Sequence, residues 1–234
     1  MFFLVCDHAG RRIPARLGDL GVSQADLERH IAWDIGAAGM GTELARALDA
    51  VLVHQRYSRL VIDCNRAPDD PGSIVPVSDG VVIPGNQALG PEDSEARRRE
   101  IFQPYQDRIS AMLGERAAQG RATILVSLHS FTPTMGGADR PWRFGVLHLG
   151  DSAFSRAVLA VLRADWGEAV GDNQPYAMDG IDFTIPHHAR AHGLDYLELE
   201  VRQDLIASAE AQIEMARVVA GVLSKAAAMI SPEP

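Results

Sequence analysis

Three short apolar segments of this chain end in side chains that can bind a metal ion or transfer a proton. The segments are Phe2–His8, Thr123–His129 and Tyr196–Glu200. In an open α/β sheet the carboxyl ends of neighbouring strands meet at one crevice, so residues far apart in sequence can come together there. Two histidines and a glutamate delivered in this way are typical of a metal hydrolase.

The two histidines, His8 and His129, need a third ligand. Zinc hydrolases commonly use three ligands of the histidine and carboxylate types and leave a fourth position for water. Asp34 is the candidate, because it opens a predicted helix whose next residues are small enough to pack closely on a sheet. An acidic residue in a first helical turn also stabilises the helix dipole, so a structural role is open. His30 is the competing ligand.

Charged and apolar residues alternate in the last segment. Glu198, Glu200 and Arg202 therefore share one face of a strand, because successive side chains point to opposite faces. A buried charged face needs ionic partners or a wet cavity. A structural ion pair and a catalytic role, in which one glutamate is the general base, are both open at this point.

Candidate substrate contacts follow other predicted strands and turns. Arg66 has a planar fork suited to a carboxylate, and Asn65 beside it can add a hydrogen bond. The alternative for Arg66 is an ion pair with Asp63 or Asp69. Tyr176 and His188 lie in polar, turn-rich sequence before the last strand, where substrate contacts and ordinary loop structure are both open.

The elements that must position these side chains alternate between short apolar runs and longer helical patterns. This order predicts parallel strands joined by crossover helices. Strands are expected at Phe2–Cys6, Val51–Gln55, Arg59–Cys64, Ala122–Leu128, Phe144–Leu149 and Tyr196–Val201. Helices are expected at Ser23–His30, Asp34–Asp49, Pro91–Gln119, Ala153–Asp165, His187–His192 and Asp204–Met229. The stretch Ala67–Leu89 has no helical period, which predicts a long surface excursion of the kind that is often functional.

Composition narrows the class of protein. The chain has 234 residues, of which 47% are hydrophobic, and we expect one domain over residues 1–234 with a frayed tail at 231–234. A net charge of −9 gives no reason to expect nucleic-acid or membrane partners. Cys6 and Cys64 lie in apolar runs, which favours buried free thiols. No apolar run is long enough for a signal or membrane segment, so a cytoplasmic location is expected.

Five motifs, taken together and in this order, resemble the N-formylglutamate amidohydrolase family. They are Asp7-His8-Ala9-Gly10, Asp34-Ile35-Gly36-Ala37, the run from Ser58 to Arg66, Ser127-Leu128-His129-Ser130-Phe131, and Glu200-Val201-Arg202-Gln203-Asp204-Leu205. The resemblance extends from about Phe3 to Ile206. The His-x-x-Glu ligand pair of zinc carboxypeptidases is absent, since Arg11 stands three residues after His8, so the acidic ligand must come from elsewhere.

This resemblance implies a three-layer α-β-α fold with a mostly parallel mixed sheet, of the phosphorylase/hydrolase-like type found in zinc carboxypeptidases. It implies one zinc ion per chain on His8, Asp34 and His129, with Glu200 as the general base. Substrate contacts would come from Asn65, Arg66, Arg202, Tyr176 and His188. The implied reaction is hydrolysis of a small N-acyl amino acid, with N-formyl-L-glutamate as the leading candidate, giving formate and glutamate.

Two other functions are compatible with these residues. A peptidoglycan amidase also combines strand-end histidines with a late glutamate, but it acts outside the cytoplasm and would be expected to carry a secretion signal. A non-catalytic protein that binds a small carboxylate could keep the same fold without turnover. The sequence leaves the acyl group, the amino-acid side chain, the metal and the oligomeric state open, together with the choice between Glu198 and Glu200 as base.

Overall fold

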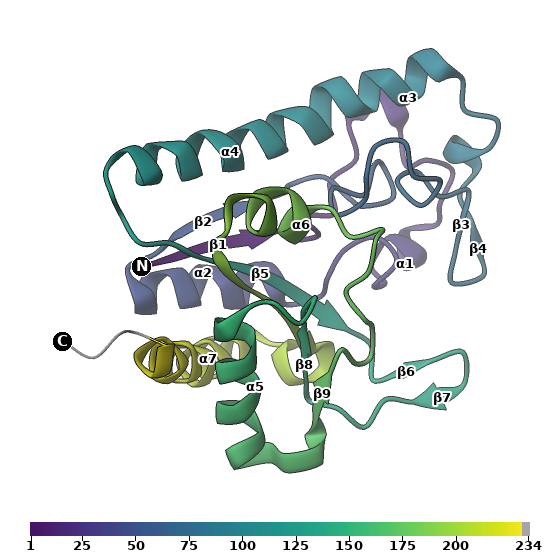
Figure 1. Cartoon of the computed structure of the whole chain (residues 1–234). Coiled ribbons are helices and arrows are strands. Elements are labelled where there is room, and N and C mark those ends of the chain that lie inside the picture. Colours follow the sequence, from purple (N-terminus) through teal and green to yellow (C-terminus); the bar gives the residue numbers. More distant parts are fainter. Residues whose placement is uncertain (231–234) are drawn as a thin grey trace.

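A mixed sheet of six strands runs through the centre of the computed structural model, which describes residues 1–230 (Figure 1). The expected frayed tail, 231–234, lies outside the described residues. The strand order is β2-β1-β5-β10-β8-β9. The strands are β1 (Phe2–Cys6), β2 (Val51–His54), β5 (Ile124–Phe131), β8 (Phe144–Leu147), β9 (Val170–Asp172) and β10 (Asp195–Arg202). Strands β2, β1, β5 and β10 are mutually parallel, and β8 and β9 run the opposite way.

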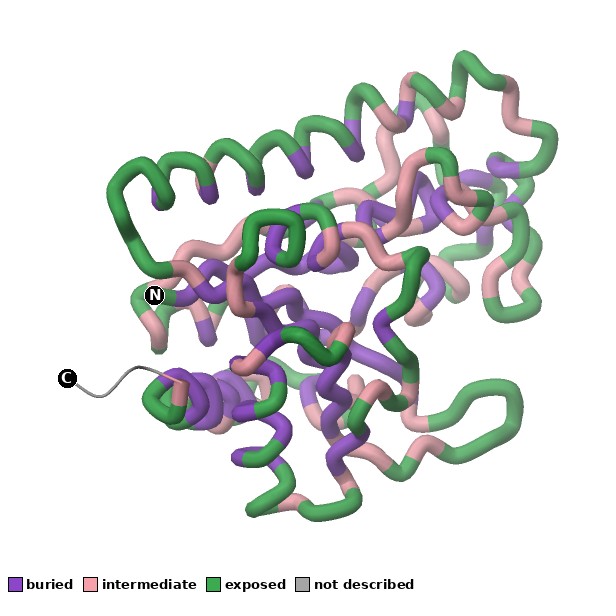
Figure 2. The backbone as a smooth tube through the Cα atoms, viewed as in Figure 1, coloured by how far each residue is buried: buried purple, intermediate pink, exposed green. Residues whose placement is uncertain are grey.

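Helices cover both faces of this sheet, which gives the expected α-β-α layers. Helices α2 (Ala37–Leu48), α5 (Ala153–Trp166) and α7 (Ala209–Ile230) pack together on one face, and α4 (Gln103–Ala118) and α6 (Thr184–His188) lie on the other (Figure 1). Successive side chains of β1 point to opposite faces of the sheet. Phe2 and Leu4 therefore pack in the core under α2, α5 and α7, and Phe3 and Val5 pack in the core under α4 and α6. The inner strands β1, β5 and β8 are accordingly buried along their length, whereas the edge strand β2 is partly exposed (Figure 2).

Short elements fill the remaining connections. They are α1 (Gln24–Leu27), α3 (Pro91–Arg97), the hairpin of β3 (Val77–Ser78) with β4 (Val81–Val82), the hairpin of β6 (Thr134–Met135) with β7 (Ala138–Asp139), and 3₁₀ turns at Ala15–Leu17, Pro84–Asn86, Gly167–Ala169, Arg190–His192 and Gln203–Ile206. The two hairpins project on the same side of the molecule in Figure 1. Ser23 caps α1 by accepting a hydrogen bond from the amide of Asp26, and Ser152 caps α5 in the same way.

The strand expected at Arg59–Cys64 is wrong. This buried segment forms turns, because Ser58 accepts the amide of Val61 at its carbonyl and the amide of Leu60 at its hydroxyl. The carboxylate of Asp63 then accepts the amide of Asn65. Serine and aspartate side chains offer the backbone these local partners, which here replace the ladder of a sheet.

The structure departs from the fold predicted from the sequence in three further ways. The helix predicted over Pro91–Gln119 is interrupted by a π-helical turn at Arg98–Phe102, just before Pro104, which has no N–H for a regular helical ladder. The three-residue edge strand β9 was not predicted, since it is too short to show a period. The Ala67–Leu89 excursion is only partly at the surface, because Ile83 is fully buried and Asn86 is held inside by backbone carbonyls.

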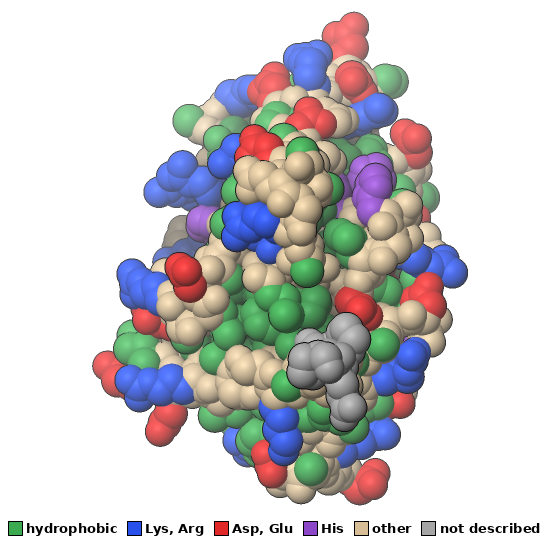
Figure 3. All heavy atoms as spheres, turned by 60° about the vertical axis from the view of Figure 1, so that its left-hand side comes forward, with side chains coloured by type: hydrophobic (Ala, Val, Ile, Leu, Met, Phe, Trp, Pro, Cys, Tyr) green, Lys and Arg blue, Asp and Glu red, His purple; other side chains and the backbone are tan. Residues whose placement is uncertain are grey.

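Surface and cysteine features agree with the composition. Cys6 and Cys64 are free and buried. None of the helices within residues 1–230 combines the length and apolar character that a membrane span requires. On the face seen in Figure 3, basic and acidic side chains are interspersed, so this face carries no extended field of one sign.

Gly36 provides a test of the packing between α2 and the C-terminal part of the chain. Its φ is +82°, and an added Cβ would lie 2.2 Å from the carbonyl oxygen of Ile206. We expect Gly36→Ala to lower the free energy of unfolding by at least about 1–2 kcal/mol, the cost of the left-handed backbone alone. Denaturant unfolding measures this change.

Gly114 is the matched control, because it lies in the exposed interior of α4 with open space around its Cα. Gly114→Ala should raise the free energy of unfolding by about 0.5–1 kcal/mol through helix propensity. Equal effects of the two substitutions would contradict the packing described for Gly36.

Candidate metal centre and substrate pocket

A cavity of about 470 Å³ opens at the carboxyl ends of β1, β5 and β10. It lies on the face of the sheet that α4 and α6 cover, because its apolar wall residues Ile31, Leu60 and Leu147 belong to the core on that side. The residues of the wall that carry chemistry are His8, His30, Asp34, Arg59, Asp63, Asn65, Arg66, His129, Tyr176, Asp182, Glu198 and Glu200. This volume is typical of a small-molecule site.

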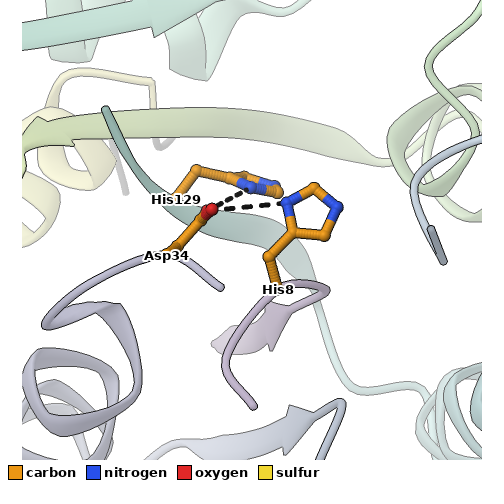
Figure 4. A group of neighbouring side chains, drawn as sticks. All are labelled: His8, Asp34 and His129. Carbon is orange, nitrogen blue, oxygen red and sulfur yellow. Dashed lines mark hydrogen bonds and ion pairs between the residues drawn. The ribbon is translucent and has the colours of Figure 1, made fainter. Parts of the chain in front are cut away.

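His8, Asp34 and His129 converge at the buried end of the cavity. Their ligand atoms all lie within 4.8 Å of one another. Oδ2 of Asp34 is 3.0 Å from Nδ1 of His129 and 3.5 Å from Nδ1 of His8, and both rings point at this carboxylate (Figure 4). The residues come from the turn after β1, the turn before α2 and the C-terminal part of β5, and each is at most 3% exposed.

The second nitrogen of each ring is held by a further side chain. Nε2 of His8 is 2.7 Å from Oδ1 of Asp63. Nε2 of His129 is 2.9 Å from the hydroxyl of Ser127 and 3.4 Å from Oδ2 of Asp7. A carboxylate on the outer nitrogen fixes the tautomer and orientation of a metal-binding imidazole. In both rings Nδ1 therefore faces Asp34, while the contacts at Nε2 fix the orientation of the ring.

Electrostatics in this cluster favour a cation. Burial alone would raise the pKa of Asp63, but the Arg59 guanidinium and His8 hold it well below its usual value. Burial likewise opposes charge on His129, yet hydrogen bonds to Asp34 and Asp7 hold the pKa of this imidazole well above its usual value. The carboxylates are thus kept ionised around a point where positive charge is stabilising.

The donor set of this cluster fits a divalent metal. Nδ1 of His8 is buried and makes no hydrogen bond with any residue of 1–230, although polar atoms in such positions normally have a partner. Two imidazole nitrogens and one carboxylate oxygen are also the ligand types of catalytic zinc sites. Asp34, and not His30, joins the two histidines in this cluster, and His30 instead faces Asp79 at 3.6 Å.

Glu198 and Glu200 lie on the cavity side of β10. Each has one buried carboxyl oxygen, Oε2, without a hydrogen-bond partner in the part of the chain that the structure describes. Burial raises the pKa of Glu198 to about 8 and that of Glu200 to about 7. Glu200 pairs in register with His129 of the adjacent strand β5. Glu198 pairs with Ser127, two residues further from the carboxyl ends of the strands. Both carboxyl groups are able to exchange protons near neutral pH.

Asn65 and Arg66 reach the cavity wall, but both have partners within the protein. The amide oxygen of Asn65 accepts the backbone N–H groups of Phe183 and Thr184 at 3.1 and 2.9 Å. Nη1 of Arg66 lies 2.6 Å from Oδ1 of Asp182. The ion pair considered for Arg66 therefore exists, with Asp182 rather than Asp63 as its partner.

Of the remaining expected substrate contacts, the structure brings only one to the cavity. Tyr176 lines it and is 40% exposed. His188 is buried away from the cavity wall and contacts Gln106 at 2.6 Å. Arg202 pairs with Asp204 and does not line the cavity either. The side chain of Arg202 lies beyond the pocket because β10 runs past it at that end.

Sequence reasoning missed the residues that support the two histidines. Asp7, Ser127 and Asp63 were not predicted to orient the rings, although Asp7 directly precedes His8 and Ser127 stands two residues before His129. Arg59 was also missed; its Nη2 is 2.6 Å from Asp63 and its Nη1 is 3.7 Å from Asp34. The signal for Asp7 and Ser127 was their spacing from the histidines on strand ends, whereas Asp63 and Arg59 lie in the segment mistaken for a strand.

The backbone beside the cluster is positioned by close packing. Gly10 follows His8, and a Cβ there would lie only 2.0 Å from the carbonyl oxygen of Arg56. The backbone amide of Asp34 donates to the carbonyl of His8 at 2.9 Å. The first contact holds the turn after β1 against the segment that follows β2, and the second joins that turn to the one before α2, so the side chains of His8 and Asp34 meet.

Comparison with known proteins agrees with this architecture. Residues 1–207 match the family model of N-formylglutamate amidohydrolase. A crystal structure of a gene product from Agrobacterium tumefaciens is similar to this chain with 39% identity and a TM-score of 0.94, covering 98% of this chain and 91% of the other. Among curated proteins, none matches this sequence significantly.

A more distant structure shares the fold. It is the crystal structure of an N-formylglutamate amidohydrolase from Ralstonia eutropha, with 19% identity and a TM-score of 0.66, covering 97% of this chain and 93% of the other. The match of the family model over residues 1–207 establishes the relationship. This chain belongs to the N-formylglutamate amidohydrolase family.

Proposed function

We propose that this protein is a zinc-dependent amidohydrolase that cleaves the amide bond of a small N-acyl amino acid. N-formyl-L-glutamate is the leading candidate substrate, and its products would be formate and glutamate. The observation that carries the proposal is the paired arrangement of His8 and His129, each with Nδ1 turned to Asp34 and Nε2 held from behind.

His8, Asp34 and His129 would hold the metal, one ion per chain. When bound, zinc would supply Lewis-acid polarisation for the amide carbonyl and make a water molecule easier to deprotonate. Asp63 and Asp7 keep the two imidazoles oriented, and Arg59 balances the negative charge of Asp34 and Asp63. The protein thus prepares the site before any ligand arrives.

Glu200 is assigned as the general base. It would take a proton from the attacking water and return it to the nitrogen of the departing amine. Its pKa, raised to about 7 by burial, suits a group that must both accept and donate a proton near neutral pH. Glu200 is preferred to Glu198 because it stands beside His129 in the sheet.

The size of the cavity supports a small substrate. A volume of about 470 Å³ is sufficient for an N-acyl amino acid. Arg66 at the wall and Asn65 beside it are candidates for contact with a substrate carboxylate, although such a contact requires Arg66 to share its charge with Asp182. Binding that fixes the scissile amide over the three-residue cluster contributes to catalysis by positioning.

Removing the ligands tests the metal centre. After equilibration with zinc and removal of excess metal, His8→Ala and His129→Ala should each hold well below one zinc per chain. Asp63→Asn should still bind zinc, but with affinity lowered about 10- to 100-fold, because the His8 ring loses its orienting carboxylate. Elemental analysis and a competition titration with a chromogenic chelator measure the two effects.

His54→Ala is the control for this experiment, since His54 also ends a strand, β2, but is exposed. It should bind as much zinc as the wild type. Undiminished zinc in a double variant lacking both His8 and His129 imidazoles would refute the site.

Two glutamate variants test the assignment of the base. Glu200→Gln should lower kcat for formate release by about 10²- to 10⁴-fold, because the amide cannot accept the proton of water. Glu198→Gln should lower kcat less, and both variants should retain zinc. Steady-state kinetics with N-formyl-L-glutamate gives the ranking, and the opposite ranking would transfer the role to Glu198.

A further inference from the structure

The arginines that line the pocket are already neutralised by carboxylates. Arg66 is paired with Asp182 at 2.6 Å. Arg59 contacts Asp63 at 2.6 Å and Asp34 at 3.7 Å. A substrate carboxylate would have to compete with a resident carboxylate at either arginine.

Arg140 differs from these two arginines. It follows β7 in the chain, and within residues 1–230 it has no ion-pair partner. Its Nη1 donates to the hydroxyls of Tyr176 at 2.8 Å and Thr132 at 3.2 Å, and its Nη2 contacts the sulfur of Met135 at 2.9 Å. These three contact residues line the pocket, so the guanidinium stands directly behind the wall.

Part of the hydrogen-bonding capacity of Arg140 is unused. A guanidinium has five N–H donors, and thioether sulfur is a weak acceptor. The Nε hydrogen and one hydrogen of Nη2 have no acceptor within the described part of the chain. The guanidinium carbon lies 4.7 Å from the ring centroid of Tyr176, which fixes the two side chains against each other.

Tyr176 lies between the guanidinium of Arg140 and the cavity. Its oxygen accepts from Arg140, while among the described residues its own O–H has only the sulfur of Met135, at 3.8 Å, as a partner. The loop before Tyr176 is pressed onto the sheet, since a Cβ on Gly145 would lie 2.3 Å from the carbonyl oxygen of Gln174. A hydroxyl that accepts from a cation is a stronger donor, and this one is held rigidly at the wall.

We propose that Arg140 and Tyr176 together bind a carboxylate of the amino-acid part of the substrate, and that Arg140 is a determinant of specificity for acidic N-acyl amino acids. Tyr176 would donate its O–H to the carboxylate, and Arg140, behind the wall, would stabilise it through the hydrogen bond to the Tyr176 oxygen and through its unpaired charge. The inference rests on the proposed function for the nature of the substrate.

Substitution of Arg140 tests this role by separating substrate binding from the chemical step. Arg140→Gln should raise KM for N-formyl-L-glutamate about ten- to hundredfold, the range expected for loss of a charge-assisted hydrogen bond, with kcat changed much less. Arg140→Lys should restore part of the affinity, because it keeps the charge without the planar fork. Tyr176→Phe should raise KM in the same direction and leaves Arg140 in place, which guards against a folding defect in Arg140→Gln.

Arg156→Gln is the matched control. Arg156 is an exposed arginine on α5, on the opposite face of the sheet, where its Nη1 donates to the carbonyl of Gly150. This variant should have the KM of the wild type. Thermal unfolding of all variants verifies that the comparison is made between folded proteins.

Three substrates identify the carboxylate that is bound. They are N-formyl-L-glutamate, N-formyl-L-glutamine, which lacks the side-chain carboxylate, and the α-amide of N-formyl-L-glutamate. The penalty of Arg140→Gln should disappear for the compound that lacks the recognised carboxylate. A penalty that is equal for all three compounds, or no penalty for any of them, overturns the inference.

A failure of the proposed reaction can be distinguished from a failure of the inference about Arg140. If zinc-loaded wild-type protein hydrolyses none of these compounds, the assignment of the reaction is wrong. The inference about Arg140 is then decided by calorimetric affinities of the same three compounds for wild type and Arg140→Gln, with the same two outcomes.

Discussion

Burial of ionised carboxylates beside two imidazoles is the constraint on which the rest of this structure depends. Asp7, Asp34 and Asp63 are each at most 4% exposed, and an unpaired charge in such a place would be very costly. The cost is offset because every carboxylate contacts a histidine or Arg59. The cluster is stable only as a set, and this mutual dependence fixes both rings in orientations suited to a metal ion.

The fold satisfies this constraint by bringing together segments that are distant in sequence. Parallel strands β1 and β5 deliver the histidines, and the turns at residues 58–66 deliver Asp63. Thr184 on α6 donates to Asp7 at 2.7 Å, and Asn65 accepts the amide of Thr184. The turns in this segment point the side chain of Asp63 at the His8 ring and that of Asn65 at the first amide of α6.

The wall of the pocket at Tyr176 differs from this cluster in how its charges are paired. The end of the cavity formed by His8, Asp34 and His129 is crowded with compensated charges, whereas Tyr176 at the wall and Arg140 behind it have no acidic partner among residues 1–230. An enzyme that recognises an anion gains from a cation that is not already neutralised, because no resident ion pair has to be broken. The neutralised Arg66 and the unpaired Arg140 therefore differ in their capacity to bind a further carboxylate, and of the two the sequence singled out only Arg66.

The sequence by itself determined most of the alternating strands and helices, the two strand-end histidines and the glutamates on one face of β10. These features are readable because strand periodicity and the convergence of strand ends are local or topological rules. Only the tertiary structure decided that Asp34 rather than His30 joins the histidines, that Asp63 and Asp7 support their rings, that Asp182 occupies Arg66, and that His188 and Arg202 lie outside the pocket. Each of these depends on which side chains meet across turns of irregular geometry, and no periodic pattern in the chain encodes such meetings.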